Sequence, residues 1–225
     1  MTDMRITVVA ATGGIGRHVL CQALAQGHEV NAVVRNPGKL VARPTRVFAV
    51  DLSDPDEPAL KEAMTGADAV LSALGSASRA EVGIAADGTR AIVQAMHTAS
   101  VRRVVAISAA PVGTVASPRR PHPPRRDPGD GFVMGHLAVP LTRAVLRDHY
   151  ADLAVMEDVL CESGLDWTVL RPPRLTDRPG TGRYRVAHGQ NPPRGWSIPR
   201  ADVADCMLKV LDRPESVGQV IGLAT

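Results

Sequence analysis

A short glycine-rich run near the start of the chain has the residue types of a phosphate-binding turn. Gly13, Gly14 and Gly16 follow an apolar, strand-like stretch and precede a stretch with helical spacing. Glycine permits a positive φ and lets the backbone approach a diphosphate, and a helix N-terminus presents free N–H groups to the phosphates. A tight turn with no ligand is the alternative. The candidate cofactor-binding residues of this turn are Ala10, Thr12, Gly13, Gly14, Ile15, Gly16 and Arg17.

Ala10 stands where a turn of this kind expects its first glycine. If position 10 needs a positive φ, the alanine methyl costs roughly 1–2 kcal/mol. Binding at a helix N-terminus can outweigh that strain, so we still predict a working cofactor loop.

The end of the second predicted strand indicates which dinucleotide the turn would bind. NAD-preferring sites place an Asp or Glu near this point for the ribose 2′-hydroxyl, but this sequence has Arg35 and no acid. A guanidinium can make paired hydrogen bonds to a 2′-phosphate and stack on adenine, so we predict NADP(H). Arg17 is expected to support the same phosphate, and Lys39 is a weaker candidate. The alternative for Arg35 is a solvated surface arginine.

Strand-like and helix-like patterns alternate along most of the chain. The predicted strands are 5–10, 29–35, 46–51, 68–74, 102–108, 166–170, 183–187 and 218–224, and the predicted helices are 16–27, 57–67, 83–100, 132–163 with a break at Pro140, and 201–214. This order predicts an α/β fold, a Rossmann-type doubly wound parallel sheet with a small C-terminal substrate-side extension. We expect one NAD(P)-binding domain over residues 1–225, with a Pro/Arg-rich loop at 111–131 and a substrate-side segment at 171–200 that begins as an irregular loop.

The carboxyl ends of the third and fourth predicted strands add further candidates, because ligands of parallel sheets lie at that edge. Asp51 and Leu52 end the third strand, where a contact with adenine is expected, although Asp51 could instead cap the turn that follows. Leu74, Gly75 and Ser76 end the fourth strand, where the nicotinamide ribose would pass.

Composition excludes several classes of protein. The net charge of +3 is small, and the aromatic content of 3% offers few platforms for stacking nucleic-acid bases. Three widely spaced cysteines support neither a disulfide framework nor a metal site. No apolar run approaches the roughly 18–20 residues that span a bilayer, and no early segment has the pattern of a secretion signal. We therefore expect a cytoplasmic protein without metal, membrane or nucleic-acid partners, as a monomer or homodimer.

Several motifs resemble one known family. ATGGIG, VVRNPGKL, DAVLSALGS, VVAIS, SGLDWTVLRPPRLTD, GTGRYRV and IPRADVADCMLKVL occur in that order. Together they resemble the atypical short-chain dehydrogenase/reductases that bind NAD(P)H, with the biliverdin reductase B and flavin reductase branch closest and the NmrA-like proteins more distant. The resemblance spans nearly the whole chain except for 111–131. It implies the fold and the cofactor more specifically than the substrate.

The resemblance also brings in residues near the nicotinamide. Ser108 matches a serine that ends the fifth strand in the flavin reductase branch, and Arg174 stands where that branch has a histidine after Pro172 and Pro173. We expect Ser108 and Arg174 to be the catalytic residues. Ser108 would hydrogen-bond the nicotinamide or the acceptor, Arg174 would hold a substrate anion or stabilise developing negative charge, and the two prolines would form the nicotinamide wall. Local backbone satisfaction is the alternative for Ser108, and an ion pair with Asp177 is the alternative for Arg174.

The Tyr-x-x-x-Lys pair of ordinary short-chain dehydrogenases is missing, because Tyr150 is followed four residues later by Ala154. A ketone needs a proton for its developing alkoxide, whereas a flavin, quinone or tetrapyrrole delocalises the charge and can take its proton from water. The sequence therefore predicts an NADPH-dependent reductase of a planar conjugated small molecule. The runner-up is a non-catalytic NADP(H)-binding sensor or regulatory protein, and an epimerase or dehydratase comes third.

The segment 111–131 is rich in Pro, Gly and Arg, so it cannot continue a central strand or a helix. Its position directly after Ser108 makes it a candidate lid whose arginines attract an acidic substrate or partner. A disordered surface excursion is the alternative.

Overall fold

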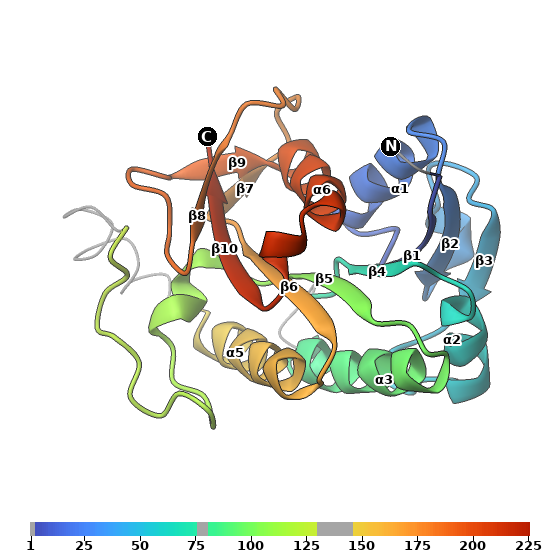
Figure 1. The fold of residues 1–225 in the computed structure, drawn as a ribbon, viewed down its shortest axis with the longest axis horizontal. Coiled ribbons are helices and arrows are strands. Elements are labelled where there is room, and N and C mark those ends of the chain that lie inside the picture. The colour runs from blue at the N-terminus through green and yellow to red at the C-terminus, as the bar shows by residue number, and fades with distance from the viewer. Residues whose placement is uncertain (1–2, 76–80, 130–145) are drawn as a thin grey trace.

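Eight strands form a single sheet through the middle of the molecule (Figure 1). The computed structural model describes residues 3–75, 81–129 and 146–225. In sheet order the strands are β3 (Arg46–Ala49), β2 (Glu29–Val34), β1 (Arg5–Val9), β4 (Ala69–Ser72), β5 (Arg103–Ile107), β6 (Asp166–Arg171), β10 (Gln219–Ala224) and β8 (Arg185–His188). Neighbouring strands are parallel except for β8, which runs antiparallel to β10.

Helices cover both faces of this sheet (Figure 1). On one face α1 (Gly16–Ala25) packs beside α6 (Arg200–Lys209); on the other, α3 (Ile84–Thr98) packs against both α2 (Glu57–Met64) and α5 (Arg147–Glu162). The central strands are buried almost throughout because helices cover them on both sides, which explains their nearly continuous apolar sequences. The Rossmann-type doubly wound fold is therefore confirmed.

The chain reverses its direction across the sheet between β1 and β4. Val8 pairs with Ala32 of β2 on one side and with Leu71 of β4 on the other. Strands β2 and β3 lie beyond the first pair, and β5, β6, β10 and β8 lie beyond the second. Ligands of open α/β sheets bind in the crevice at such a switch point, and the glycine-rich turn follows β1 at this place.

The sequence prediction was wrong for the start of the substrate-side segment. An irregular loop was expected there, but β7 (Arg174–Thr176) pairs in parallel with β9 (Ser197–Pro199) in a separate two-stranded sheet. Three-residue strands are too short for an alternating pattern, and Pro172 and Pro173 directly before β7 are residues that usually mark a loop.

The predicted helix over 132–163 is found in its second half. Helix α5 begins at Arg147 after Leu146, and residues 130–145, with the predicted break at Pro140, lie outside the described residues.

The segment 111–129 is anchored at both ends, because Val112, Thr114, Ser117 and Asp127 are buried. Most of 118–126 between these anchors is exposed at the surface. The segment begins in the 3₁₀ turn η3 (Ala110–Thr114). The Ser117 hydroxyl and the Arg119 N–H donate to the two carboxylate oxygens of Asp158 on α5, each over 3.0 Å. Arg120 folds back on its own loop and donates to the carbonyl of Val112 over 2.8 Å. Arg120 is thus used locally, rather than presented to a ligand.

Candidate functional site

The turn between β1 and α1 has the close backbone packing that its glycines allow. An ideal Cβ placed on Gly16 would lie 2.1 Å from the carbonyl oxygen of Ala10, and one on Gly13 would lie 3.2 Å from the same atom. The Gly13 N–H donates to that carbonyl over 2.9 Å. Helix α1 therefore starts directly against the end of β1, which aims its first N–H groups at the carboxyl edge of the sheet.

Ala10 has a φ of 58°, the left-handed conformation that the sequence pattern raised as a cost. Its N–H donates to the carbonyl of Val33 over 3.0 Å, so β2 fixes the residue in place. A single alanine in this conformation is strained by roughly 1–2 kcal/mol.

Ala10→Gly is therefore expected to stabilise the protein. Relief of the left-handed strain exceeds the greater flexibility of glycine in the unfolded chain, which leaves a net gain of about 0.5–1 kcal/mol. Chemical denaturation of the variant and the wild type measures this gain. A loss of stability would show that the methyl makes packing contacts worth more than the strain.

A cleft of about 180 Å³ lies at the carboxyl edge of β1 to β4. The sequence predicted eight of its lining residues, namely Ala10, Thr12, Gly13, Arg35, Asp51, Leu52, Leu74 and Gly75. It did not predict Val33, Asn36, Val50, Glu81 and Ile84, which complete the lining together with Lys39. The lining combines apolar side chains with charges of both signs, a combination that suits an adenosine with a polar ribose.

Arg35 extends over this cleft, and a carboxylate lies against it. Its Nη1 lies 2.9 Å from Oε1 of Glu81, and the Arg35 side chain is 60% exposed while that of Glu81 is 23% exposed. The hydrogen bond and the charge of Glu81 raise the pKa of Arg35. The pairing partner was not predicted, because Glu81 stands just before α3, far from β2 in the sequence.

Asp51 is fixed at the end of β3 by a local turn. Its Oδ1 accepts hydrogen bonds from the backbone N–H of Ser53 over 3.0 Å and from the Ser53 hydroxyl over 2.7 Å. These bonds lower the pKa of Asp51 and keep it ionised. Asp51 thus caps its own turn and also lines the cleft, while the cap of α2 is Asp56.

Two further arginines, Arg17 and Arg200, lie at the glycine-rich turn. An ideal Cβ on Gly14 would lie 2.8 Å from Nε of Arg200, the first residue of α6. Asp177 holds that side chain over the turn, with its Oδ1 2.8 Å from Nη1 of Arg200 and 3.6 Å from Nη2 of Arg17. Arg17 pairs with Asp177 and does not line the cleft with Arg35, so its expected support of the same phosphate stays a prediction.

The pKa of His18, which lies beside these arginines, is lowered. Burial, the guanidinium of Arg17 and, more weakly, that of Arg200 lower its pKa, while Asp177 partly opposes them. Two cations beside a helix N-terminus give the turn an electrostatic preference for an anion.

Ser108 follows β5 and belongs to a buried polar network. Its hydroxyl donates to Oε1 of Glu157 over 2.6 Å, and the residue is only 5% exposed. Nε of Arg171 donates to the same oxygen over 2.8 Å, and Nη2 of Arg171 donates to the other carboxylate oxygen. Ser108 therefore has a side-chain partner that the sequence did not predict, and its only hydroxyl proton is engaged by Glu157.

Of the remaining predicted residues, Pro172 lies near the end of β5, Arg174 is exposed, and one lies outside the described part of the chain. The carbonyl of Pro172 accepts from the N–H of Ala110 over 2.9 Å, so the proline wall stands next to the end of β5. Arg174 is exposed at the start of β7, and Asp177 pairs with Arg200 and Arg17 rather than with Arg174. Ser76 lies outside the described residues. Tyr150 is buried in the core between the sheet, α3 and α5.

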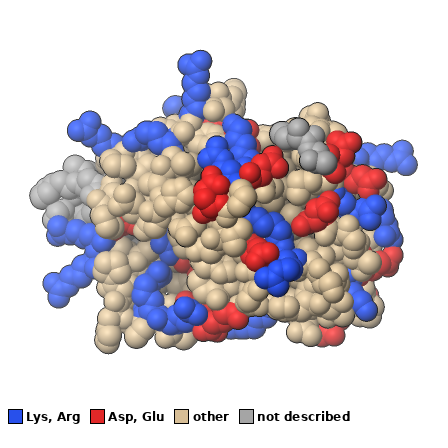
Figure 2. All heavy atoms as spheres, in the orientation of Figure 1, with Lys and Arg blue, Asp and Glu red and all other residues tan. Residues whose placement is uncertain are grey.

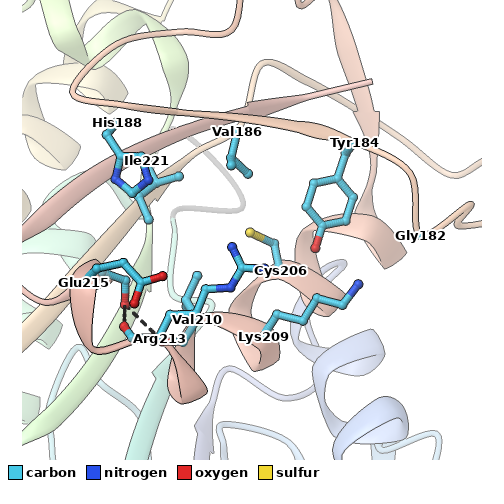
Figure 3. A pocket seen from close by; sticks show the side chains of 11 residues that line it. Gly182, Tyr184, Val186, His188, Cys206, Lys209, Val210, Arg213, Glu215 and Ile221 are labelled. Atoms are coloured by element: carbon cyan, nitrogen blue, oxygen red, sulfur yellow. Dashed lines mark hydrogen bonds between the residues drawn. The ribbon is translucent and has the colours of Figure 1, made fainter.

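A separate hollow of about 260 Å³ lies between β8, β10 and α6 (Figure 3). Figure 3 shows the Tyr184 hydroxyl pointing toward α6; it donates to Asp205 over 2.6 Å, and Lys209 pairs with the same carboxylate oxygen at 2.7 Å. This hollow shares no lining residue with the cleft of β1 to β4.

Cys206 at the base of this hollow is expected to resist alkylation. Burial raises the pKa of its thiol to about 11, so roughly 0.1% is thiolate at pH 8. Cys21 is exposed and serves as the internal comparison. Mass spectrometry after brief iodoacetamide treatment of the folded protein should find Cys21 modified well before Cys206. Equal rates would contradict the burial of Cys206.

The described residues 3–75, 81–129 and 146–225 contain no group of three His, Cys, Asp or Glu side chains that could hold a metal ion. Within the same ranges, no helix is long and apolar enough to cross a membrane. Basic and acidic side chains are interspersed over the face shown in Figure 2, with no basic stripe of the kind that follows a nucleic-acid backbone.

A glycine turn at the switch point of a doubly wound sheet, with a cleft beside it, defines an NAD(P)-binding Rossmann protein. The chain belongs to the NAD(P)H-binding family, whose sequence profile matches residues 10–214. The family resemblance predicted from the motifs is confirmed at this level.

Two relatives illustrate the range of the match. The uncharacterized protein YwnB of Bacillus subtilis is 26% identical over 220 residues, which cover 94% of each chain. The uncharacterized protein Rv2047c of Mycobacterium tuberculosis is 34% identical over 102 residues, which are 45% of this chain and only 12% of that protein.

Solved structures share the fold over nearly their full length. A short-chain dehydrogenase/reductase of Veillonella parvula in complex with NADP has a TM-score of 0.77 at 18% identity, covering 100% of this chain and 95% of that one. ChuY, an anaerobilin reductase of Escherichia coli O157:H7, has a TM-score of 0.75 at 22% identity, covering 98% and 96%. SP1627 of Streptococcus pneumoniae, provisionally assigned as an NADH-flavin reductase, has a TM-score of 0.75 at 22% identity, covering 98% and 99%. At these identities the likeness concerns the fold.

Proposed function

We propose that the protein is an NADPH-dependent reductase that transfers hydride to a planar conjugated acceptor of the flavin, quinone or tetrapyrrole type. The observation that carries the proposal is the cleft at the switch point, with an arginine at the end of β2 and a glycine turn beneath two further arginines. We also propose that the chain acts in the cytoplasm, as one domain.

The residues present fit the cofactor. The apolar side chains of Leu52 and Leu74 suit an adenine, and Arg35 suits a 2′-phosphate. The absence of a Cβ at Gly14 lets the Arg200 side chain lie directly against the turn, and that side chain with Arg17 suits the diphosphate. When bound, NADPH supplies the hydride, and the protein supplies position and charge.

Ser108, Pro172 and Pro173 would border the nicotinamide at the ends of β5 and β6. The Ser108 hydroxyl donates its hydrogen bond to Glu157, so toward a ligand this oxygen can act only as a hydrogen-bond acceptor. Ser108 would therefore accept a hydrogen bond from an N–H, such as that of the nicotinamide carboxamide. Arg174 would attract an anionic group of the acceptor from its exposed position on β7.

We propose a conjugated acceptor because helix α5 lacks the Tyr/Lys pair that would donate a proton to a ketone substrate. Ala154 occupies the place of the catalytic lysine and Tyr150 is buried in the core. A conjugated acceptor needs no strong proton donor, since its developing charge is delocalised. That anaerobilin reductase has this fold is consistent with a tetrapyrrole-like acceptor.

A non-catalytic NADP(H)-binding sensor is the second candidate. The observation that favours it is the buried network in which the Ser108 hydroxyl is bound to Glu157. Because α5 also lacks the Tyr/Lys pair, few groups near the nicotinamide site could act as an acid or a base.

One experiment separates these functions. Purified protein is mixed with NADPH and then with FMN, biliverdin or a quinone, and the loss of nicotinamide absorbance is followed. Turnover on at least one acceptor is expected. Tight NADPH binding with no turnover on any of them would favour the sensor, and no binding of NADPH would overturn both.

A further inference from the structure

Arg35 and Glu81 form an ion pair inside the cleft that the cofactor would enter. Both residues line that cleft, and their charged atoms lie 2.9 Å apart. The guanidinium that suits a 2′-phosphate is therefore paired with a carboxylate of the protein itself. The two residues come from different elements, the end of β2 and the segment just before α3, so the pairing is tertiary rather than local.

We propose that Glu81 determines how strongly the protein discriminates between NADP(H) and NAD(H). This inference rests on the proposed cofactor site. Glu81 weakens the binding of NADP(H), because its carboxylate and the 2′-phosphate compete for one guanidinium and repel each other. It also supports NAD(H), because a carboxylate can accept a hydrogen bond from the free 2′-hydroxyl.

The other charged groups of the cleft leave this role to Glu81. Asp51 also acts on Arg35 through its charge, but Ser53 holds its Oδ1 in the local turn. Lys39 is a second cation at the rim and cannot accept a hydrogen bond from a ribose. Glu81 is thus the carboxylate in contact with Arg35. It would bind the ribose 2′-hydroxyl, the role that an acid at the end of β2 has in NAD-preferring proteins.

The test is the affinity of NADPH and of NADH for four proteins: wild type, Glu81→Gln, Arg35→Ala and Asp87→Asn. Asp87 lies on the first turn of α3 and pairs with Arg90 outside the cleft, so Asp87→Asn removes the same charge nearby without touching Arg35. Each dissociation constant is measured by fluorescence titration or calorimetry at low salt and at 0.5 M NaCl.

Glu81→Gln is expected to tighten the binding of NADPH roughly two- to fivefold and to weaken the binding of NADH by a similar factor. These are the effects of gaining or losing one exposed charge contact. The gain for NADPH should shrink at high salt because it is electrostatic. Arg35→Ala should weaken NADPH roughly tenfold or more while changing NADH little. Asp87→Asn should change the ratio of the two affinities by less than about twofold.

An equal change of both affinities in Glu81→Gln, or a ratio that matches Asp87→Asn, would overturn the assignment of Glu81 while leaving the cofactor site intact. If the wild type bound neither NADPH nor NADH, the proposed function itself would fall, and the role of Glu81 with it.

Discussion

Replacing Glu157 by alanine is expected to lower the free energy of unfolding by about 3–5 kcal/mol, the usual result of breaking a buried ion pair. The Glu157 and Arg171 side chains are each 6% exposed, and the guanidinium donates to both carboxylate oxygens. Removing the carboxylate leaves a buried cation without its counter-charge and leaves the Ser108 hydroxyl without its acceptor. Urea denaturation followed by circular dichroism measures the loss.

Glu162→Ala on the same helix is the matched control. Its carboxylate lies 3.9 Å from Arg119 and is 63% exposed, so its removal should change stability by no more than about 0.5 kcal/mol. Replacing both Glu157 and Arg171 by apolar residues should cost less than the sum of the two single changes, because no unpaired charge remains. Additive costs would show that the two side chains act independently, contrary to the geometry.

The order of the elements could be predicted because the sheet is covered on both faces. Strands such as β1, β4 and β5 are nearly continuous apolar runs, and segments of helical period lie between β1 and β2 and between β4 and β5. The ribbon of β7 and β9 could not be predicted, since its two strands are short and pair across more than twenty residues. Its position depends on tertiary contacts that no local pattern reports.

The lining of the cleft at the carboxyl edge of β1 to β4 could be predicted for residues that follow strands, but not for residues that reach the cleft from other elements. Arg35, Asp51 and Leu74 were found because parallel strands end at one edge of the sheet. Glu81 and Arg200 were missed because they enter from helix starts, for which strand order gives no rule.

Glu157 did leave a signal in the sequence. It lies on α5 between Leu153 and Leu160, four residues after the first and three before the second, and both leucines are buried. A carboxylate on the apolar stripe of a helix must find a buried partner, which identifies the position even though the partner Arg171 cannot be named from spacing.

Gly16→Ala is expected to damage the cofactor site more than any change to a side chain of the cleft. The added Cβ would lie 2.1 Å from the carbonyl oxygen of Ala10, 2.9 Å from its carbonyl carbon and 3.0 Å from Cα of Ala11. All three are backbone atoms, so the turn itself must shift. Overpacking of this kind costs about 1–3 kcal/mol of stability, and we expect at least a tenfold loss of affinity for NADPH, measured by fluorescence titration.

Gly14→Ala is the control, because the contact there is of a different kind. Its Cβ would meet Nε of Arg200 at 2.8 Å and Cδ at 3.0 Å, and both atoms belong to a flexible side chain that can turn away. Stability should change by less than about 1 kcal/mol, with a smaller loss of affinity as Arg200 is displaced. In the proposed site both glycines would lie at the diphosphate, which the two dinucleotides share, so each variant should weaken the binding of NADPH and of NADH by the same factor. A change in their ratio would mean that the turn touches the ribose end as well, and a Gly16→Ala protein that bound like wild type would show that α1 does not begin against Ala10.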